Sequence, residues 1–156
     1  MAPRHPEPLK VVIDTSSALP VLLSVGVDNH WLVLLWQANK IIPLINSETV
    51  EELKAQIIEH SPTAKELQAR RFLIKTMNRY EPWCVTMPLV AVPDAPQCRD
   101  ASDQMFIDLA IAGEAGILFT RDPDLLTMDP GPTFRILDDR DGLPTLAAQE
   151  QGAISP

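Results

Sequence analysis

Residues 98–128, CRDASDQMFIDLAIAGEAGILFTRDPDLLTM, decide the fold, because this stretch contains one complete helix and strand. Apolar residues recur three and four positions apart over 105–112, as on the buried side of an amphipathic helix. Residues of good capping type precede this pattern, and two glycines are expected to end the helix. Residues 117–120, ILFT, then form a short apolar run suited to a buried strand. The run stops near Asp122, so a carboxylate is expected at the carboxyl end of a strand.

The beginning of the chain repeats this arrangement. Residues 11–13, VVI, form an apolar run that stops at Asp14, and Thr15 follows directly. In a parallel α/β sheet the carboxyl ends of the strands meet at one crevice. Asp14 and Asp122 are therefore expected to contribute to a single site, although more than a hundred residues separate them.

The remaining sequence alternates between strand and helix patterns. Strands are expected at 10–14, 40–45, 83–87 and 133–137, with the third of these at a sheet edge. Helices are expected after Asp14, with Pro20 in the first turn, at 29–38, from Ser47 onward, at 63–80 and within the tail at 144–151. In the helix at 63–80, three apolar residues are expected to face inward, Leu67, Ile74 and Met77. These patterns indicate a single α/β domain.

Composition narrows the class of protein. The chain has 156 residues, of which 46% are hydrophobic, enough for one core without disulfide bonds. Its two cysteines lack zinc-site spacing, and its amino terminus lacks the apolar core of a signal peptide, so a soluble cytoplasmic protein without a membrane span is expected. The formal net charge of −8 argues against binding nucleic acid by bulk electrostatics. A nuclease whose acids are neutralised by a metal remains compatible with that charge.

Each acid near the expected site has an ordinary explanation as a cap, a turn residue or a solvated side chain. Together they form a set that can face one end of the sheet. Several carboxylates in one cleft repel one another, and a divalent cation relieves that repulsion. Oxygen ligands suit Mg²⁺ or Mn²⁺, which activate water and stabilise the charged oxygens during phosphodiester hydrolysis.

In this order the residues resemble a known family. The apolar strand before Asp14-Thr15, Glu52-Leu53 on a helix, Arg99-Asp100 with Asp103 before MFIDLA, and ILFTRDPDLL with Asp122 are similar to the PIN-domain ribonucleases. The resemblance spans about 11–137, with a PIN-like domain over 9–140 and a carboxyl-terminal tail over 141–156. It is strongest toward relatives of the VapC toxins of toxin–antitoxin pairs.

The resemblance implies a three-layer α/β/α sandwich with a central parallel sheet and a metal-dependent endoribonuclease site. Asp14, Asp103 and Asp122 would hold Mg²⁺ or Mn²⁺, and Glu52 would orient water or help a second ion. Glu48 and Glu51 compete with Glu52 for its position, and the number of ions stays open. Further residues would support these acids by hydrogen bonds or through water: Thr15, Asp100, Thr120 and Asp124. Thr15-Ser16 replaces the family's commoner Thr-Asn.

Basic residues near the acids are candidates for RNA binding. Arg99 and Arg121 adjoin the acids, although both are equally suited to balancing charge. A second set shares one helix face at intervals of four, which more often marks a solvated surface: Arg71, Lys75 and Arg79. The apolar run with Trp31 and Trp36 is expected to pack in the core, with an antitoxin groove or a homodimer face as the alternatives.

Three other functions are weighed. A haloacid dehalogenase-type phosphatase would carry a second Asp two residues after Asp14, where this chain has Ser16. A dinucleotide-binding oxidoreductase would need a glycine-rich first turn, which DTSSALP lacks. The three histidines have no metal-ligand spacing and are expected at the surface: His5, His30 and His60. A catalytically silent PIN-like module that binds RNA or protein is the non-enzyme alternative.

Overall fold

A computed structural model describes residues 7–142. Its sheet has five parallel strands in the order β3-β2-β1-β4-β5. The strands are β1 (Leu9–Ile13), β2 (Ile41–Ile45), β3 (Val85–Thr86), β4 (Ile117–Phe119) and β5 (Arg135–Leu137). The predicted strand at 83–87 is thus only two residues long, and it lies at a sheet edge as expected.

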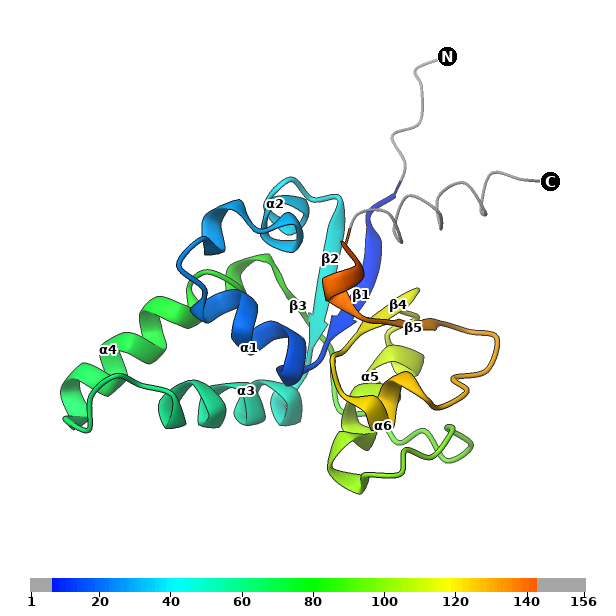
Figure 1. Cartoon of the computed structure of the whole chain (residues 1–156). Helices are drawn as coiled ribbons and strands as arrows, with labels where there is room; N and C mark the ends of the chain where they lie inside the picture. The colour runs from blue at the N-terminus through cyan, green and yellow to red at the C-terminus, as the bar shows by residue number, and fades with distance from the viewer. Residues whose placement is uncertain (1–6, 143–156) are drawn as a thin grey trace, which may run out of the picture.

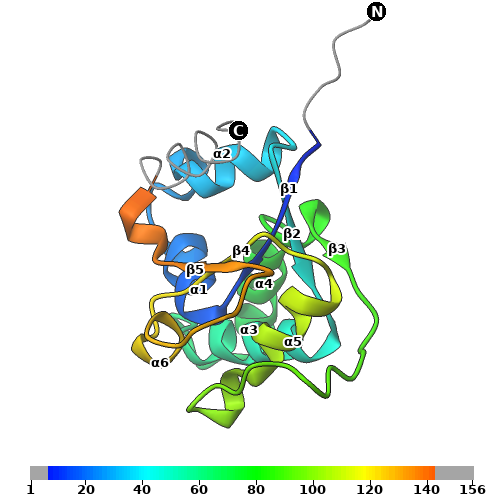
Figure 2. The same ribbon diagram turned by 90° about the vertical axis from the view of Figure 1, so that its right-hand side faces the viewer.

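Helices cover both faces of the sheet, which confirms the predicted three-layer α/β/α sandwich. On one side lie α1 (Thr15–Leu23), α2 (Trp31–Gln37), α3 (Ser47–Glu59) and α4 (Glu66–Met77). On the other side lie α5 (Gln104–Ala112) and α6 (Pro123–Leu126), and Figure 2 shows the molecule from that side. Short 3₁₀ turns occupy Val27–Asn29, Glu81–Trp83, Ala101–Asp103 and Asp139–Asp141.

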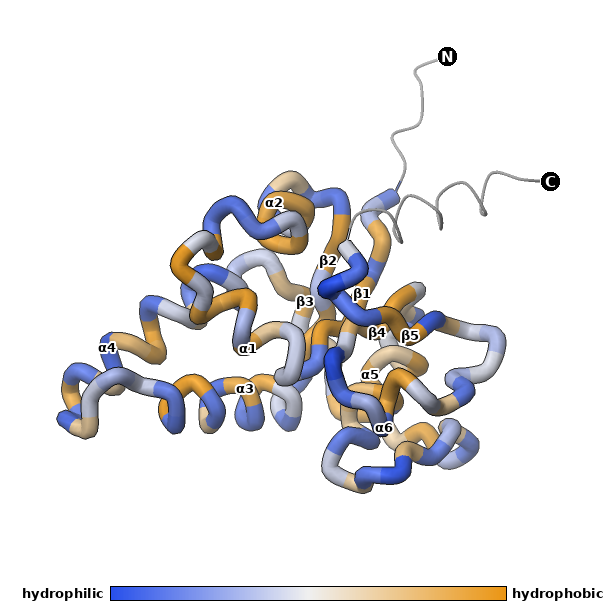
Figure 3. The backbone as a smooth tube through the Cα atoms, viewed as in Figure 1, coloured by the Kyte–Doolittle hydropathy of each residue, from blue (hydrophilic) through white to orange (hydrophobic). Residues whose placement is uncertain are grey.

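The two cores follow from the alternation of side chains along β1. Val11 and Ile13 point into the core beneath α1 to α4, whereas Val12 points into the core beneath α5 and α6. All three are nearly inaccessible to solvent. A strand buried on both faces must be apolar throughout, which explains the VVI run and the orange stretch at β1 in Figure 3.

The strand order reverses between β1 and β4, which pair with each other although they are far apart in sequence. From β1 the chain moves outward to β2 and β3, while β4 and β5 extend the sheet in the other direction. Ile13 pairs with Phe119, so both strands end at the same level. A crevice opens outside the carboxyl ends of strands at such a switch point.

The structure corrects two predictions about helix interiors. Pro20 lies within α1 rather than in its first turn, because Asp14 itself caps the helix and Thr15 begins it. In α4 Met77 is buried as predicted, but Leu67 is 62% exposed and Ile74 is 59% exposed. Helix α4 packs on α3 rather than on the sheet, so only part of its apolar side is buried.

Helix α5 ends as predicted, with Gly113 as its C-cap. The residue in the left-handed conformation is Glu114, with φ of 54°, rather than either of the neighbouring glycines. The Ala115 amide donates to the Ala110 carbonyl and the Glu114 amide donates to the Ile111 carbonyl, which is a Schellman ending. Gly113 is needed for another reason, since a Cβ there would collide with the Leu44 side chain.

The apolar run at α2 packs mainly in the core. Trp36 is fully buried beside Tyr80, and Trp31 meets the Phe119 ring edge-on at 5.7 Å. His30 is half-buried and caps α2 by accepting a hydrogen bond from the Leu32 amide, so its predicted surface position is wrong. None of the helices within residues 7–142 has the length and apolar character needed to cross a membrane. His5 and the helix predicted at 144–151 lie outside the described residues.

Candidate active site

Asp14 forms the centre of the site, at the point where β1 ends and α1 begins. Its side chain caps α1 by accepting the Ser17 amide at 3.2 Å, and it also accepts the hydroxyls of Ser16 at 2.6 Å and Thr120 at 2.7 Å. Asp14 is only 2% exposed. Burial raises its pKa to about 6, the three hydrogen bonds oppose that rise, and the negative charge of Asp122 adds to it.

Asp103 and Asp122 approach the same end of the sheet from the other core. Asp103 ends the 3₁₀ turn before α5, and Asp122 caps α6 immediately after β4. Burial raises the pKa of Asp103 to about 7, and Asp122 contributes both as a hydrogen-bond partner and as a charge. One buried oxygen of Asp103, Oδ2, has no partner among the described residues. The negative charge of Asp122 disfavours ionisation of Asp103, and a bound cation would relieve that repulsion.

Glu52 reaches the site from α3. The Thr15 hydroxyl donates to its Oε2 at 2.9 Å, so α1 and α3 are joined next to Asp14. Glu51 is exposed, and Glu48 lines a separate groove together with Asp108 of α5. Of the three glutamates considered for this position, Glu52 is the one that the structure connects to the residue following Asp14.

Three further candidates lie at the rim of this acidic group. Asp124 follows Asp122 in α6, and its amide donates to the Asp122 carboxylate at 2.9 Å. Arg99 comes within 3.7 Å of the Asp124 carboxylate with its side chain 82% exposed. Asp100 is also exposed, and its carboxylate accepts hydrogen bonds from the Ser102 amide and hydroxyl. These hydrogen bonds lower the pKa of Asp100.

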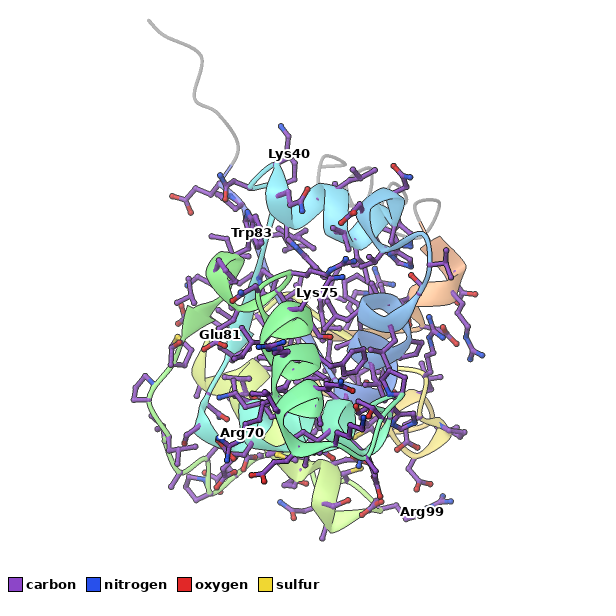
Figure 4. All side chains as sticks on the ribbon, turned by 90° about the vertical axis from the view of Figure 1, so that its left-hand side faces the viewer. Lys40, Arg70, Lys75, Glu81, Trp83 and Arg99 are labelled. Atoms are coloured by element: carbon purple, nitrogen blue, oxygen red, sulfur yellow. The ribbon has the colours of Figure 1, made fainter. Side chains whose placement is uncertain are left out.

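The basic stripe on α4 is separate from these acids. Arg71 and Lys75 are exposed, while Arg79 is half-buried and lies 3.9 Å from Asp28. Figure 4 shows Lys75 on α4 and Arg99 on the segment before α5, near the lower edge of the molecule. The two groups of basic residues therefore come from different elements, and their roles in RNA binding stay predictions.

Three polar residues in the hydrogen-bond network around Asp14 were not predicted as site residues, namely Ser16, Ser17 and Asp139. Ser16 links Asp14 to the Arg121 amide, and Ser17 donates its hydroxyl to Asp139 at 2.6 Å. Asp139 also binds the Arg121 guanidinium through two nitrogens. The missed signal was Asp138-Asp139 directly after the apolar run of β5, the same pattern of a strand ending in Asp that identified Asp14 and Asp122.

The acids can be tested for their fit to a divalent cation. Within the described part of the chain, no three or more His, Cys, Asp or Glu side chains are arranged so that they could hold a metal ion as they stand. Asp14 instead uses both oxygens to accept hydroxyl protons. The chemistry of the donors nevertheless suits a hard cation, because all are oxygens and the buried Asp103 Oδ2 lacks a partner.

With this geometry established, comparison with known proteins identifies the family. A model described as PIN domain matches residues 10–124. The chain belongs to the PIN domain family. This confirms the resemblance seen in the sequence, and PIN domains are in general nucleases. No significant match was found among curated proteins.

Two solved structures resemble this PIN domain. VapBC2 from Rickettsia felis, in a crystal structure bound to a DNA fragment from the VapBC2 promoter, has a TM-score of 0.52 and 14% identity. That match covers 83% of this chain and 98% of the other chain. PAE2754 from Pyrobaculum aerophilum has a TM-score of 0.49 and 13% identity over 92% of this chain and 90% of its own. At such identities the likeness to VapBC2 shows the fold alone.

Proposed function

We propose that this PIN domain is a metal-dependent endoribonuclease that hydrolyses RNA phosphodiester bonds. The single observation that carries the proposal is the group of buried acids, in which Asp14 and Asp103 have raised pKa values and Asp103 Oδ2 has no partner within residues 7–142. An acid group of this kind is costly for folding, so it points to a positively charged ligand.

The residues divide into two roles in this proposal. Asp14, Asp103 and Asp122 would hold Mg²⁺ or Mn²⁺, and such an ion, when bound, supplies activated water and stabilises the attacking and leaving oxygens. Glu52, aligned by the Thr15 hydroxyl, would orient the attacking water or help to hold a second ion. The exposed Arg99 would contact a phosphate of the RNA.

The proposal extends to the cellular role as the toxin of a toxin–antitoxin pair. Its support is the fold shared with VapBC2 and the membership of the PIN domain family. An antitoxin protein and a second copy of this chain are the proposed partners, in a cytoplasmic setting. Induced expression should arrest bacterial growth for the wild type and spare it for Asp14→Asn.

The experiment that tests the nuclease is cleavage of a structured RNA by the purified protein with Mg²⁺ or Mn²⁺, against a chelator control. Asp103→Asn should abolish cleavage, because it removes the acid with the unpartnered oxygen. Asp108→Asn is the matched control, since Asp108 lies on α5, which begins directly after Asp103, but lines the separate groove. Equal activity of Asp103→Asn and the wild type would refute the assignment.

The alternative, a silent module that binds RNA or protein, has its own signature. It would bind RNA equally well with and without the divalent ion, and neither Asp103→Asn nor the chelator would change that binding. The phosphatase alternative is disfavoured by Ser16, which stands where a second aspartate is required and is held between Asp14 and the Arg121 amide.

A further inference from the structure

Asp139, two residues after β5, is a buried acid outside the group of proposed metal ligands. Its side chain is fully inaccessible to solvent. It accepts three short hydrogen bonds, from the Ser17 hydroxyl at 2.6 Å, Arg121 Nε at 2.9 Å and a terminal Arg121 nitrogen at 2.8 Å. Such bidentate pairing fixes both the position and the plane of the guanidinium group.

Both partners of Asp139 lead directly to the proposed metal ligands. The Ser17 amide donates to the Asp14 carboxylate, while the Ser17 hydroxyl donates to Asp139. The Arg121 amide donates to Ser16, whose hydroxyl binds Asp14. Arg121 also directly precedes Asp122 in the chain. Asp139 therefore joins the start of α1, which carries Asp14, to the turn after β4, which carries Asp122.

The energetics of a buried ion pair favour a geometric role. Burying two charges costs about as much as their attraction returns, so apolar residues of similar size would often give equal stability. A neighbouring pair, Arg140 with Asp138, makes the same bidentate contact with side chains 60% and 15% exposed, and within residues 7–142 its hydrogen bonds do not extend to Asp14. What distinguishes the Arg121–Asp139 pair is that hydrogen bonds and the chain itself connect it to Asp14 and Asp122.

We propose that Asp139 is a positioning residue that, through Arg121 and Ser17, fixes the positions of Asp14 and Asp122, two of the acids proposed to bind the metal. This inference rests on the proposed function. It also reassigns Arg121: two of its nitrogens are held by Asp139, and its side chain is only 24% exposed. The Arg121–Asp139 pair thus acts as a brace that holds the site in place, and Arg121 does not serve as an RNA contact.

The test compares two arginines that each form a bidentate pair with an aspartate. Arg121→Met removes the brace, and Arg140→Met removes the Arg140–Asp138 pair as the matched control. Mn²⁺ binding is measured by electron paramagnetic resonance without RNA, and kcat and KM are then measured for RNA cleavage. Urea unfolding and circular dichroism establish that each variant is folded.

The brace predicts that Arg121→Met weakens Mn²⁺ binding about 10- to 100-fold and lowers kcat, with KM for RNA changed little, as for other residues that orient ligands. Arg140→Met should match the wild type in every measurement. Because Arg121→Met leaves a buried unpaired charge, it can fail to fold. The double variant Arg121→Met with Asp139→Leu contains no such charge, and it should show the same loss of Mn²⁺ affinity.

Two results would overturn the inference. If Arg121→Met raises KM for RNA and leaves Mn²⁺ binding unchanged, Arg121 is a phosphate contact. If the folded double variant binds Mn²⁺ as the wild type does, the pair serves folding alone. Failure of the wild type to bind Mn²⁺ would overturn both this inference and the nuclease. Mn²⁺ binding without RNA cleavage would remove only the nuclease, and the affinities would still decide on the brace.

Discussion

Replacing Asp14 with asparagine should stabilise the folded protein at pH 8, even though it destroys the proposed site. Burial raises the pKa of Asp14 from its ordinary value of 3.8 to about 6. A difference of about 2 pKa units corresponds to about 3 kcal/mol of unfolding free energy. Asparagine has nearly the same shape and carries no charge, so the variant avoids this cost and loses only one of the two acceptors that the hydroxyls use.

The sign follows from where the proton binds more tightly. With a raised pKa, the folded protein holds the Asp14 proton more tightly than the unfolded chain does. The cost is therefore absent below about pH 4, grows as the pH rises, and is complete above about pH 7. Between pH 4.5 and pH 8 the wild type should lose about 2 kcal/mol relative to Asp14→Asn.

Urea unfolding at several pH values, without divalent ions, measures this directly. For a typical dependence of about 2 kcal/mol per molar urea, the difference between the two midpoints should change by about 1 M between pH 4.5 and pH 8. Comparing the variant with the wild type cancels the contributions of the other acids. Asp100→Asn serves as the control, because the pKa of Asp100 is lowered and its pH dependence has the opposite sign.

A difference between wild type and Asp14→Asn that stays constant across this pH range would refute the reasoning. It would mean that hydrogen bonds from Ser16, Ser17 and Thr120 fully compensate for burial of the carboxylate. A difference that shrinks as the pH rises would be more damaging still, since it would mean that the folded protein prefers the charged form.

Three further predictions follow from the site, the helix end and the two isoleucine environments. Mn²⁺ should raise the melting temperature of the wild type but not of Asp14→Asn. The affinity for Mn²⁺ should increase from pH 5.5 to pH 8, because Asp14 and Asp103, with pKa values of about 6 and about 7, ionise over this range. A Mn²⁺ affinity that calorimetry finds independent of pH would contradict this. Glu114→Gly should increase the unfolding free energy by about 1 kcal/mol, because glycine adopts the left-handed conformation without strain, and an unchanged urea midpoint would argue against it. Ile57→Ala should cost about 2 to 5 kcal/mol, whereas Ile74→Ala should stay within about 0.5 kcal/mol, and equal urea midpoints would refute the assignment of the exposed face of α4.

The strands and the two acids that follow them could be predicted from the sequence. A central parallel strand is buried on both faces, so it reads as an unbroken apolar run, and its end is marked by the first polar residue. Asp14 stands at such an end and Asp122 follows the end of β4 by three residues, and parallel pairing of β1 with β4 brings both to one edge. This inference needs only local patterns and one topological rule.

The buried side of α4 could not be predicted in the same way. Leu67, Ile74 and Met77 share a helical period, but the structure buries only Met77. Periodicity identifies a face of a helix without identifying what covers it. Here α4 packs against α3 rather than against the sheet, and that contact leaves Leu67 and Ile74 exposed.

The sequence by itself determined where the apolar runs of the strands lie and which acids follow them, because both features are set by residues that are adjacent in the chain. Only the tertiary structure decided that Asp139 and Ser17 meet across 122 positions of chain, and that Asp139 binds the Arg121 guanidinium, which is only partly exposed. The pairing of β4 with β5 and the packing of α1 bring these groups together. A buried ion pair depends on which distant surfaces exclude water, and no local pattern contains that information.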